Sequence, residues 1–297
     1  MVKYEQEDYI KAYEELGKTG TNVNALVMLT EMSYEEKNRL VEYKNDKRYR
    51  PEDYDERINT VFKHMISTFF KLDNANRLYG DFKENYSQKY LDNTDDDTND
   101  YRNDTMIKLN KIFHFVNNLE GQDLKGTELL SLIRNEIDED SKEVLSDYYF
   151  DIQFKGLKSL SDRIRLSNIN EKIDMIPSFL HEIGDMEAHL FKRKLFYDDY
   201  RKSVTGLVNY LLSRAGIPEI YIKPIELDEY YSYVNKGESL DNEEIVTFYK
   251  EKMCDSIEDL LIVPMKNIVS NYLDQQIKRE SGELDNKIIT LKQNKYK

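Results

Sequence analysis

Apolar side chains recur at intervals of three and four residues along most of this chain, the spacing that places them on one face of an α-helix. The longest such pattern runs from Pro51, a residue type favoured in the first turn of a helix, to Gly80, a type that commonly ends one. Shorter patterns of the same kind predict helices over residues 4–16, 22–31, 33–43, 82–91, 105–119, 127–148, 168–190, 203–215 and 241–261.

One stretch, residues 151–164, carries a different pattern. The pairs Ile152/Phe154 and Leu157/Leu160 indicate alternation and predict a small β-hairpin. The chain has only 11 glycines and 5 prolines, few for a turn-rich β fold. The predicted fold class is therefore mainly α, with a multi-helix core, extra N-terminal helices and at most one small β-hairpin.

The clearest interruption of the apolar pattern is residues 92–104, where Tyr101 is the only apolar residue and like charges repel one another. We interpret this stretch as an acidic mobile loop or linker. The regions expected around it are an N-terminal helical region, a helical region with the predicted hairpin, a helical core, and a C-terminal helix with a polar tail: 1–91, 105–164, 165–263 and 264–297.

Composition narrows the classes of partner and compartment. The formal net charge of −14 comes without any basic stripe, so direct binding to nucleic acid is not expected. Such a charge instead suits a basic protein surface, or mimicry of nucleic acid. The single cysteine, Cys254, fits a reducing compartment, and no run of 18 apolar residues predicts a membrane span. We therefore expect a cytoplasmic protein that does not enter a membrane.

Residues 194–261 hold the one order of residue types that is typical of a site. The polar run KLFYDDYRK at 194–202 leads into the helix predicted at 203–215, and a helix N-terminus can hold an anion. The helix carries Asn209 and ends in Ala-Gly-Ile-Pro, followed by a short extended stretch, a Tyr-rich segment and a further helix. Over about residues 188–261, this order resembles the C-terminal half of a Fic (Fido-fold) domain.

The Fic signature, H-x-F-x-[DE]-G-N-G-R, falls on residues 194–202 when the two are aligned from Gly216. Phe196 and Asp198 match it. The family uses the acidic residue to hold Mg²⁺ and the His as general base on a target hydroxyl. The resemblance therefore implies Asp198 as the metal ligand and places Lys194 where the catalytic His would stand.

The same resemblance implies the groups that would surround a nucleotide. Arg201 and Lys202, at the end of the signature, would neutralise phosphates, with Asn209 on the following helix beside them. An alternative alignment, with a five-residue insertion after the opening H-x-F, moves the place of the catalytic His to His189.

Departures from the signature decide the function that we expect. A lysine at position 194 is protonated at neutral pH and is a poor base. Tyr200 and Arg201 put side chains where the family's Gly-rich turn offers bare backbone. We expect a non-catalytic or repurposed Fic-like protein that needs no cofactor and binds and modulates another protein, such as an inhibitor carried by a phage or mobile element.

Two alternatives stay open. One is a transferase that uses Mg²⁺ and ATP to modify a protein hydroxyl, and the other is an acidic mimic of nucleic acid that inhibits a nucleic-acid-binding enzyme. The sequence carries no P-loop, G-x-G-x-x-G, H-E-x-x-H, C-x-x-C or G-x-S-x-G motif, which removes the common hydrolases, dehydrogenases and zinc enzymes. For the interface with a protein partner we predict four tyrosines, a residue type enriched in such surfaces: Tyr221, Tyr230, Tyr231 and Tyr233.

Overall fold

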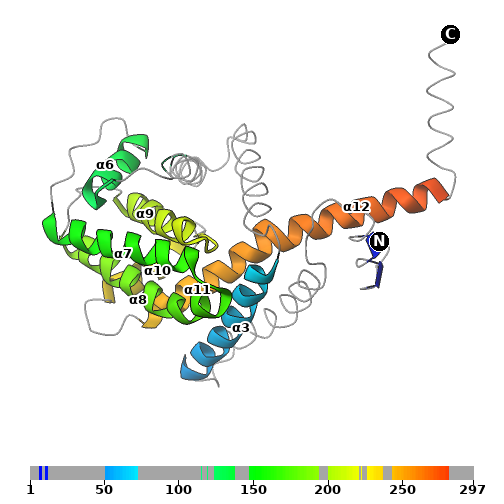
Figure 1. The fold of residues 1–297 in the computed structure, drawn as a ribbon, viewed down its shortest axis with the longest axis horizontal. Coiled ribbons are helices and arrows are strands. Elements are labelled where there is room, and N and C mark those ends of the chain that lie inside the picture. The colour runs from blue at the N-terminus through cyan, green and yellow to red at the C-terminus, as the bar shows by residue number, and fades with distance from the viewer. Residues whose placement is uncertain are drawn as a thin grey trace, which may run out of the picture.

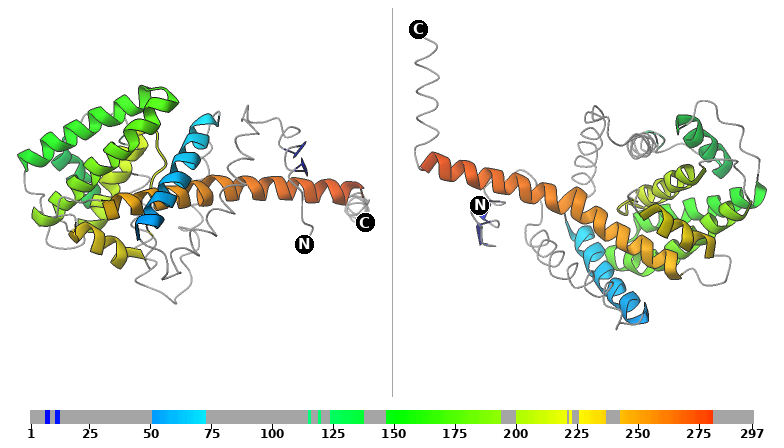
Figure 2. Two further views of the ribbon diagram at one scale, coloured as in Figure 1. Left: turned by 90° about the horizontal axis from the view of Figure 1, so that it is seen from below. Right: turned by 180° about the vertical axis from the view of Figure 1, so that it is seen from behind.

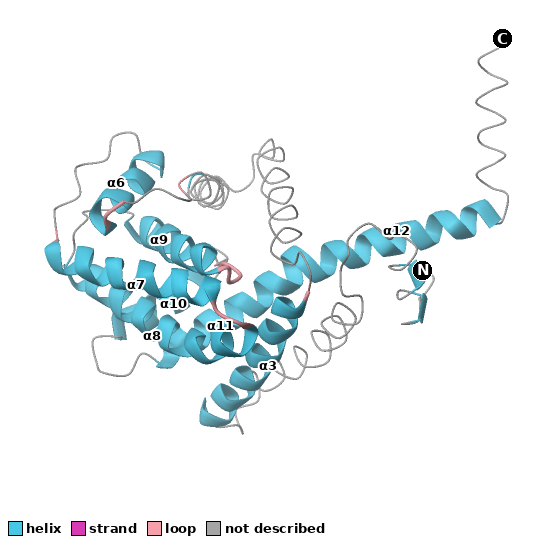
Figure 3. Ribbon diagram, in the orientation of Figure 1, coloured by secondary structure: helices cyan, strands magenta, loops and turns pink. Residues whose placement is uncertain are grey.

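The computed structural model describes residues 51–72, 124–137, 147–193, 200–220, 226–236 and 243–280, together with positions 7, 8, 11, 12, 115, 119 and 222. These residues form eight α-helices and no strand (Figures 1 and 3), which confirms the prediction of a mainly α fold. The helices are α3 (Pro51–Lys71), α6 (Gly126–Ile137), α7 (Tyr148–Leu166), α8 (Ile169–Arg193), α9 (Tyr200–Ala215), α10 (Leu227–Lys236), α11 (Glu243–Ile257) and α12 (Val263–Glu280).

The predicted hairpin at 151–164 is wrong, because this stretch lies within α7. Asp147 caps the helix by accepting a hydrogen bond from the Phe150 N–H at 3.0 Å. The buried side chains then follow helical spacing along one face: Phe150, Phe154, Leu157, Ser161 and Ile164. The alternating pairs contain only two residues of this buried face, Phe154 and Leu157. They also contain Ile152, which is exposed.

The single helix predicted over 127–148 is also corrected. The structure confirms that prediction as far as Ile137, but Asp147 has extended backbone angles, so Tyr148 begins a new helix. The acidic loop predicted at 92–104 lies outside the described residues. So do the helices predicted at 22–31, 33–43 and 82–91, and most of those at 4–16 and 105–119.

Helices over most of the ranges predicted at 168–190, 203–215 and 241–261 are confirmed. Pro177 lies inside α8, which continues past it to Arg193. Helix α9 ends at Ala215, and the φ of 70° at the following Gly216 is a left-handed conformation that favours glycine. The Ile217 N–H then donates to the Leu212 carbonyl at 3.0 Å and closes the helix end.

A π-helical turn, Glu258–Ile262, joins α11 to α12. The backbone N–H of Val263 donates to the Glu258 carbonyl across this turn. Pro264 follows directly and has no N–H to continue the α-helical hydrogen bonds, which accounts for the π turn before it.

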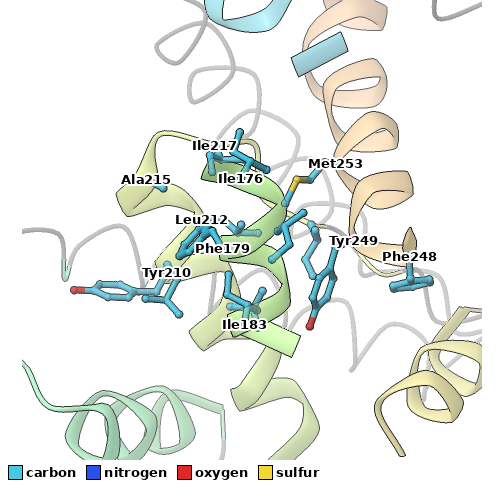
Figure 4. Close-up of a cluster of buried hydrophobic side chains, with 14 of the residues drawn as sticks. Ile176, Phe179, Ile183, Tyr210, Leu212, Ala215, Ile217, Phe248, Tyr249 and Met253 are labelled. Atoms are coloured by element: carbon cyan, nitrogen blue, oxygen red, sulfur yellow. The ribbon is translucent and has the colours of Figure 1, made fainter. Parts of the chain in front are cut away.

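Helix α8 is the centre of the assembly, since it packs against α3, α7, α9, α10 and α11. Figure 4 shows the core where α8, α9 and α11 meet, with Phe179, Ile183, Leu212 and Met253 turned toward one another. Helix α12 leaves this body and runs outward as a rod, as both views of Figure 2 show. Among the described helices, none has the length and apolar character needed to cross a membrane.

Packing between α6 and α7 gives a first prediction. A Cβ at Gly126 would lie 2.8 Å from the Phe150 ring and 2.9 Å from the Phe154 Cβ, so Gly126→Ala should lower the free energy of unfolding by about 1–3 kcal/mol through overpacking. A Cβ at Gly156, exposed within α7, meets nothing within 4 Å. Gly156→Ala should therefore raise that free energy by about 0.5–1 kcal/mol. Urea unfolding of both variants checks this, and equal effects would contradict the packing.

Candidate functional site

The residues predicted from the signature lie partly in a gap in the described chain, residues 194–199, and partly after it. Lys194 and Asp198 lie outside the described residues, as does Tyr221. Arg201 and Lys202 lie in the first turn of α9, so the end of the predicted loop is helical. The predicted helix start at residue 203 is thereby corrected to Tyr200.

Asn209 is buried in α9, and its side-chain amide forms hydrogen bonds with the backbone of Ile220, in the extended stretch that follows the helix. The Asn209 Nδ2 donates to the Ile220 carbonyl and the Ile220 N–H donates to the Asn209 Oδ1, both at 2.9 Å. These two bonds hold the extended stretch after Gly216 against α9. The structure thus gives Asn209 a backbone-pairing role, and its place beside a nucleotide stays a prediction.

A second buried polar group lies deeper, where α8, α10 and α11 meet. The Glu187 carboxyl accepts a hydrogen bond from the Tyr230 hydroxyl at 2.5 Å and another from the Tyr249 hydroxyl. All three residues have no exposed surface. Thr205 of α9 adds a side-chain hydrogen bond to Tyr230, so the cluster joins four helices. We call Glu187, Tyr230, Tyr249 and Thr205 the carboxyl–tyrosine cluster.

Burial sets the protonation of the carboxyl–tyrosine cluster. Loss of hydration raises the pKa of Glu187 to about 7, although the hydrogen bonds from the two tyrosines act in the opposite direction. Burial, and then the nearby Glu187 carboxyl, raise the pKa values of Tyr230 and Tyr249 well above 10, so both phenols stay protonated and donate. The Glu187 carboxyl therefore keeps its proton up to about pH 7, and because the cluster has no exposed surface it cannot reach a substrate.

Three of the tyrosines predicted as interface residues belong to α10. Tyr230 is a core residue, because its hydroxyl finds its partner inside the protein, which corrects the prediction. Tyr231 and Tyr233 are partly buried: the Tyr231 ring lies 6.1 Å from that of Phe191, and the Tyr233 hydroxyl donates to Glu229 at 2.7 Å. Both therefore help to seat α10, and neither is a freely projecting anchor.

His189, the alternative catalytic residue, pairs with the residue that caps α7. Its Nε2 lies 3.3 Å from the Asp147 Oδ2, and its ring centroid lies 4.8 Å from that of Tyr149. The pair is largely covered, with side-chain exposures of 17% for His189 and 10% for Asp147. It fixes the start of α7 against α8.

Reasoning from sequence missed two features of this region. Glu187 follows Ile183 and Met186 on the apolar face of α8, and a carboxyl at such a position signals a buried partner. The second is a group of exposed residues at the start of α7: Tyr148, Tyr149 and Ile152. We call this group the aromatic patch. The sequence feature that could have indicated this patch is the pair of adjacent tyrosines directly after Asp147, the residue that caps α7.

The described residues hold no cluster of three or more His, Cys, Asp or Glu side chains that could bind a metal ion. Comparisons of the chain with protein-family models, with curated proteins and with solved structures find no match.

Proposed function

We propose that this protein is a non-catalytic or repurposed Fic-like protein that acts by binding and modulating another protein. The observation that carries the proposal is how the buried polar groups around α9 are used. Both functional groups of the Asn209 amide pair with the Ile220 backbone, and the Glu187 carboxyl pairs with Tyr230 and Tyr249. Each of these groups is bonded to a partner inside the protein, and the bonds hold helices in place. Such a use of buried polar groups fits a structural scaffold.

The surface of the described helices supports the same proposal. Large apolar side chains are exposed at both ends of α7, with Tyr148 81% exposed and Leu166 86% exposed. A contiguous exposed apolar group, such as the aromatic patch, commonly marks a site for another macromolecule. The charge of −14 gives such a surface a preference for a basic partner and speeds the encounter with it.

Capture of a partner from an extract of the native cell tests the proposal. The tagged full-length chain should retain one protein in a stable complex. Asp198→Ala should retain it equally well, and added Mg²⁺ and ATP should not release it, because binding does not depend on the place implied for a metal. Mass spectrometry of the eluted complexes, with the tag alone as control, gives the measurement. Retention of no protein, or retention that needs Asp198 and nucleotide, would contradict the proposal.

A further inference from the structure

The aromatic patch is an apolar surface at one end of the helical body. Tyr148, Tyr149 and Ile152 are 81%, 60% and 54% exposed. The spacing of Tyr148 and Ile152, four residues apart in α7, puts them one above the other on the same side of the helix, with Tyr149 beside them. Two aromatic rings and a branched aliphatic side chain thus present one surface.

The backbone that carries this patch is held at several points. One oxygen of Asp147 caps α7 through the Phe150 N–H, and its other oxygen lies 3.3 Å from His189. The adjacent Phe150 is fully buried, and the Tyr149 ring rests against the His189 ring. The exposed side chains therefore project from a fixed helix end, so a partner would not have to order the backbone when it binds.

Charge indicates the chemistry of the occupant. The chain carries a formal net charge of −14. Tyrosine faces attract Lys and Arg cations, and the net negative charge of the protein favours the approach of a basic segment. An acidic partner segment would be repelled by that charge.

We propose that the aromatic patch is the docking surface for a basic segment of a partner protein, which sets a Lys or Arg against Tyr148 and Tyr149 and an aliphatic side chain on Ile152. The proposal rests on the proposed function, since it names where and by what chemistry the partner binds. Contact with Ile152 requires an apolar residue between the basic ones, so a purely polar cationic segment would bind more weakly.

Fluorescence anisotropy with two labelled peptides tests the proposal. One peptide alternates Arg and Leu, and the other carries Glu in place of each Arg. The full-length protein should bind the basic peptide and not the acidic one. The double variant Tyr148→Ser/Ile152→Ser should weaken binding of the basic peptide by about tenfold or more, because both anchors are lost while the net charge is unchanged.

Leu166→Ser is the matched control, because it also removes an exposed apolar side chain from α7 but at the other end of the helix. It should leave the affinity unchanged, and unchanged melting temperatures should show that all variants fold. Equal binding of the two peptides, or wild-type affinity in the double variant, would overturn the proposal. A wild-type oligomer that the double variant does not form would identify a second copy as the occupant and would overturn the proposal as well.

Capture from cell extract separates this inference from the function on which it rests. If the double variant still retains the partner protein that the wild type retains, the patch is not the docking surface, while the proposed function stands. If neither retains a protein, the proposed function itself fails.

Discussion

Replacing Glu187 by alanine should lower the free energy of unfolding by about 3–5 kcal/mol. The change leaves the hydroxyls of Tyr230 and Tyr249 buried without their acceptor, and each unsatisfied buried group costs about 1–3 kcal/mol. It also opens a cavity where α8, α10 and α11 meet. Urea unfolding followed by circular dichroism gives the value.

Glu187→Gln gives the sharper result, because it keeps the shape of the side chain and removes its charge. Folding raises the pKa of Glu187 from 4.5 to about 7, so the folded state holds a proton over this range that the unfolded state releases. The contribution of the group to stability is therefore greatest below pH 4.5 and falls as the pH rises to 7, by roughly 3 kcal/mol in total. Above about pH 8, where the folded state has also released the proton, the loss is complete and constant.

The difference in stability between Glu187→Gln and the wild type should consequently grow in favour of the variant from about pH 5 to pH 8. Taking this difference cancels the titration of groups that both proteins share, such as Asp55, whose pKa burial raises, and His64, whose pKa burial lowers. A difference that does not change with pH would show that Glu187 has no raised pKa and is not enclosed as described.

The second large effect is expected at Asn209. Asn209→Ala should lower the free energy of unfolding by about 2–4 kcal/mol, because the N–H and the carbonyl of Ile220 both lose their partners inside the protein. Thermal and urea unfolding measure the loss. Faster amide hydrogen exchange at Ile220 should accompany it, since that N–H is no longer bonded to a side chain.

Asn209→Asp is the companion variant, since it keeps an acceptor for the Ile220 N–H but removes the donor to the Ile220 carbonyl and adds a buried charge. It should therefore also destabilise the fold, while the Ile220 amide keeps its protection from exchange. A wild-type stability for Asn209→Ala would show that the stretch after Gly216 is held by something other than this side chain.

The sequence was sufficient to predict features that depend on neighbouring residues. The spacing of Val204, Leu207 and Leu211 predicted α9, and Gly216 with the proline two residues later predicted its end. The sequence placed Asn209 on the same helix, but it did not indicate that the Asn209 amide bonds to the backbone of Ile220. The resemblance to Fic domains stays a proposal, as Lys194 and Asp198 lie outside the described residues.

Features that join distant parts of the chain could not be predicted in this way. Glu187 lies 43 residues from Tyr230 and 62 from Tyr249, so no local pattern relates the three. Tyr230 was therefore interpreted from its residue type alone, as an interface residue. The predicted hairpin failed for a different reason: alternating pairs were counted over a few residues, while the full buried face of α7 continues at helical spacing to Ile164.

The central claim is that this protein binds another protein without modifying it. The most direct measurement is the intact mass of the partner captured by the full-length chain in the presence of Mg²⁺ and ATP, wild type beside Asp198→Ala. The account predicts an unmodified partner, retained equally by both. A partner whose mass has gained a nucleotidyl or phosphoryl group with the wild type and not with Asp198→Ala would contradict it, and would show that the protein is a transferase.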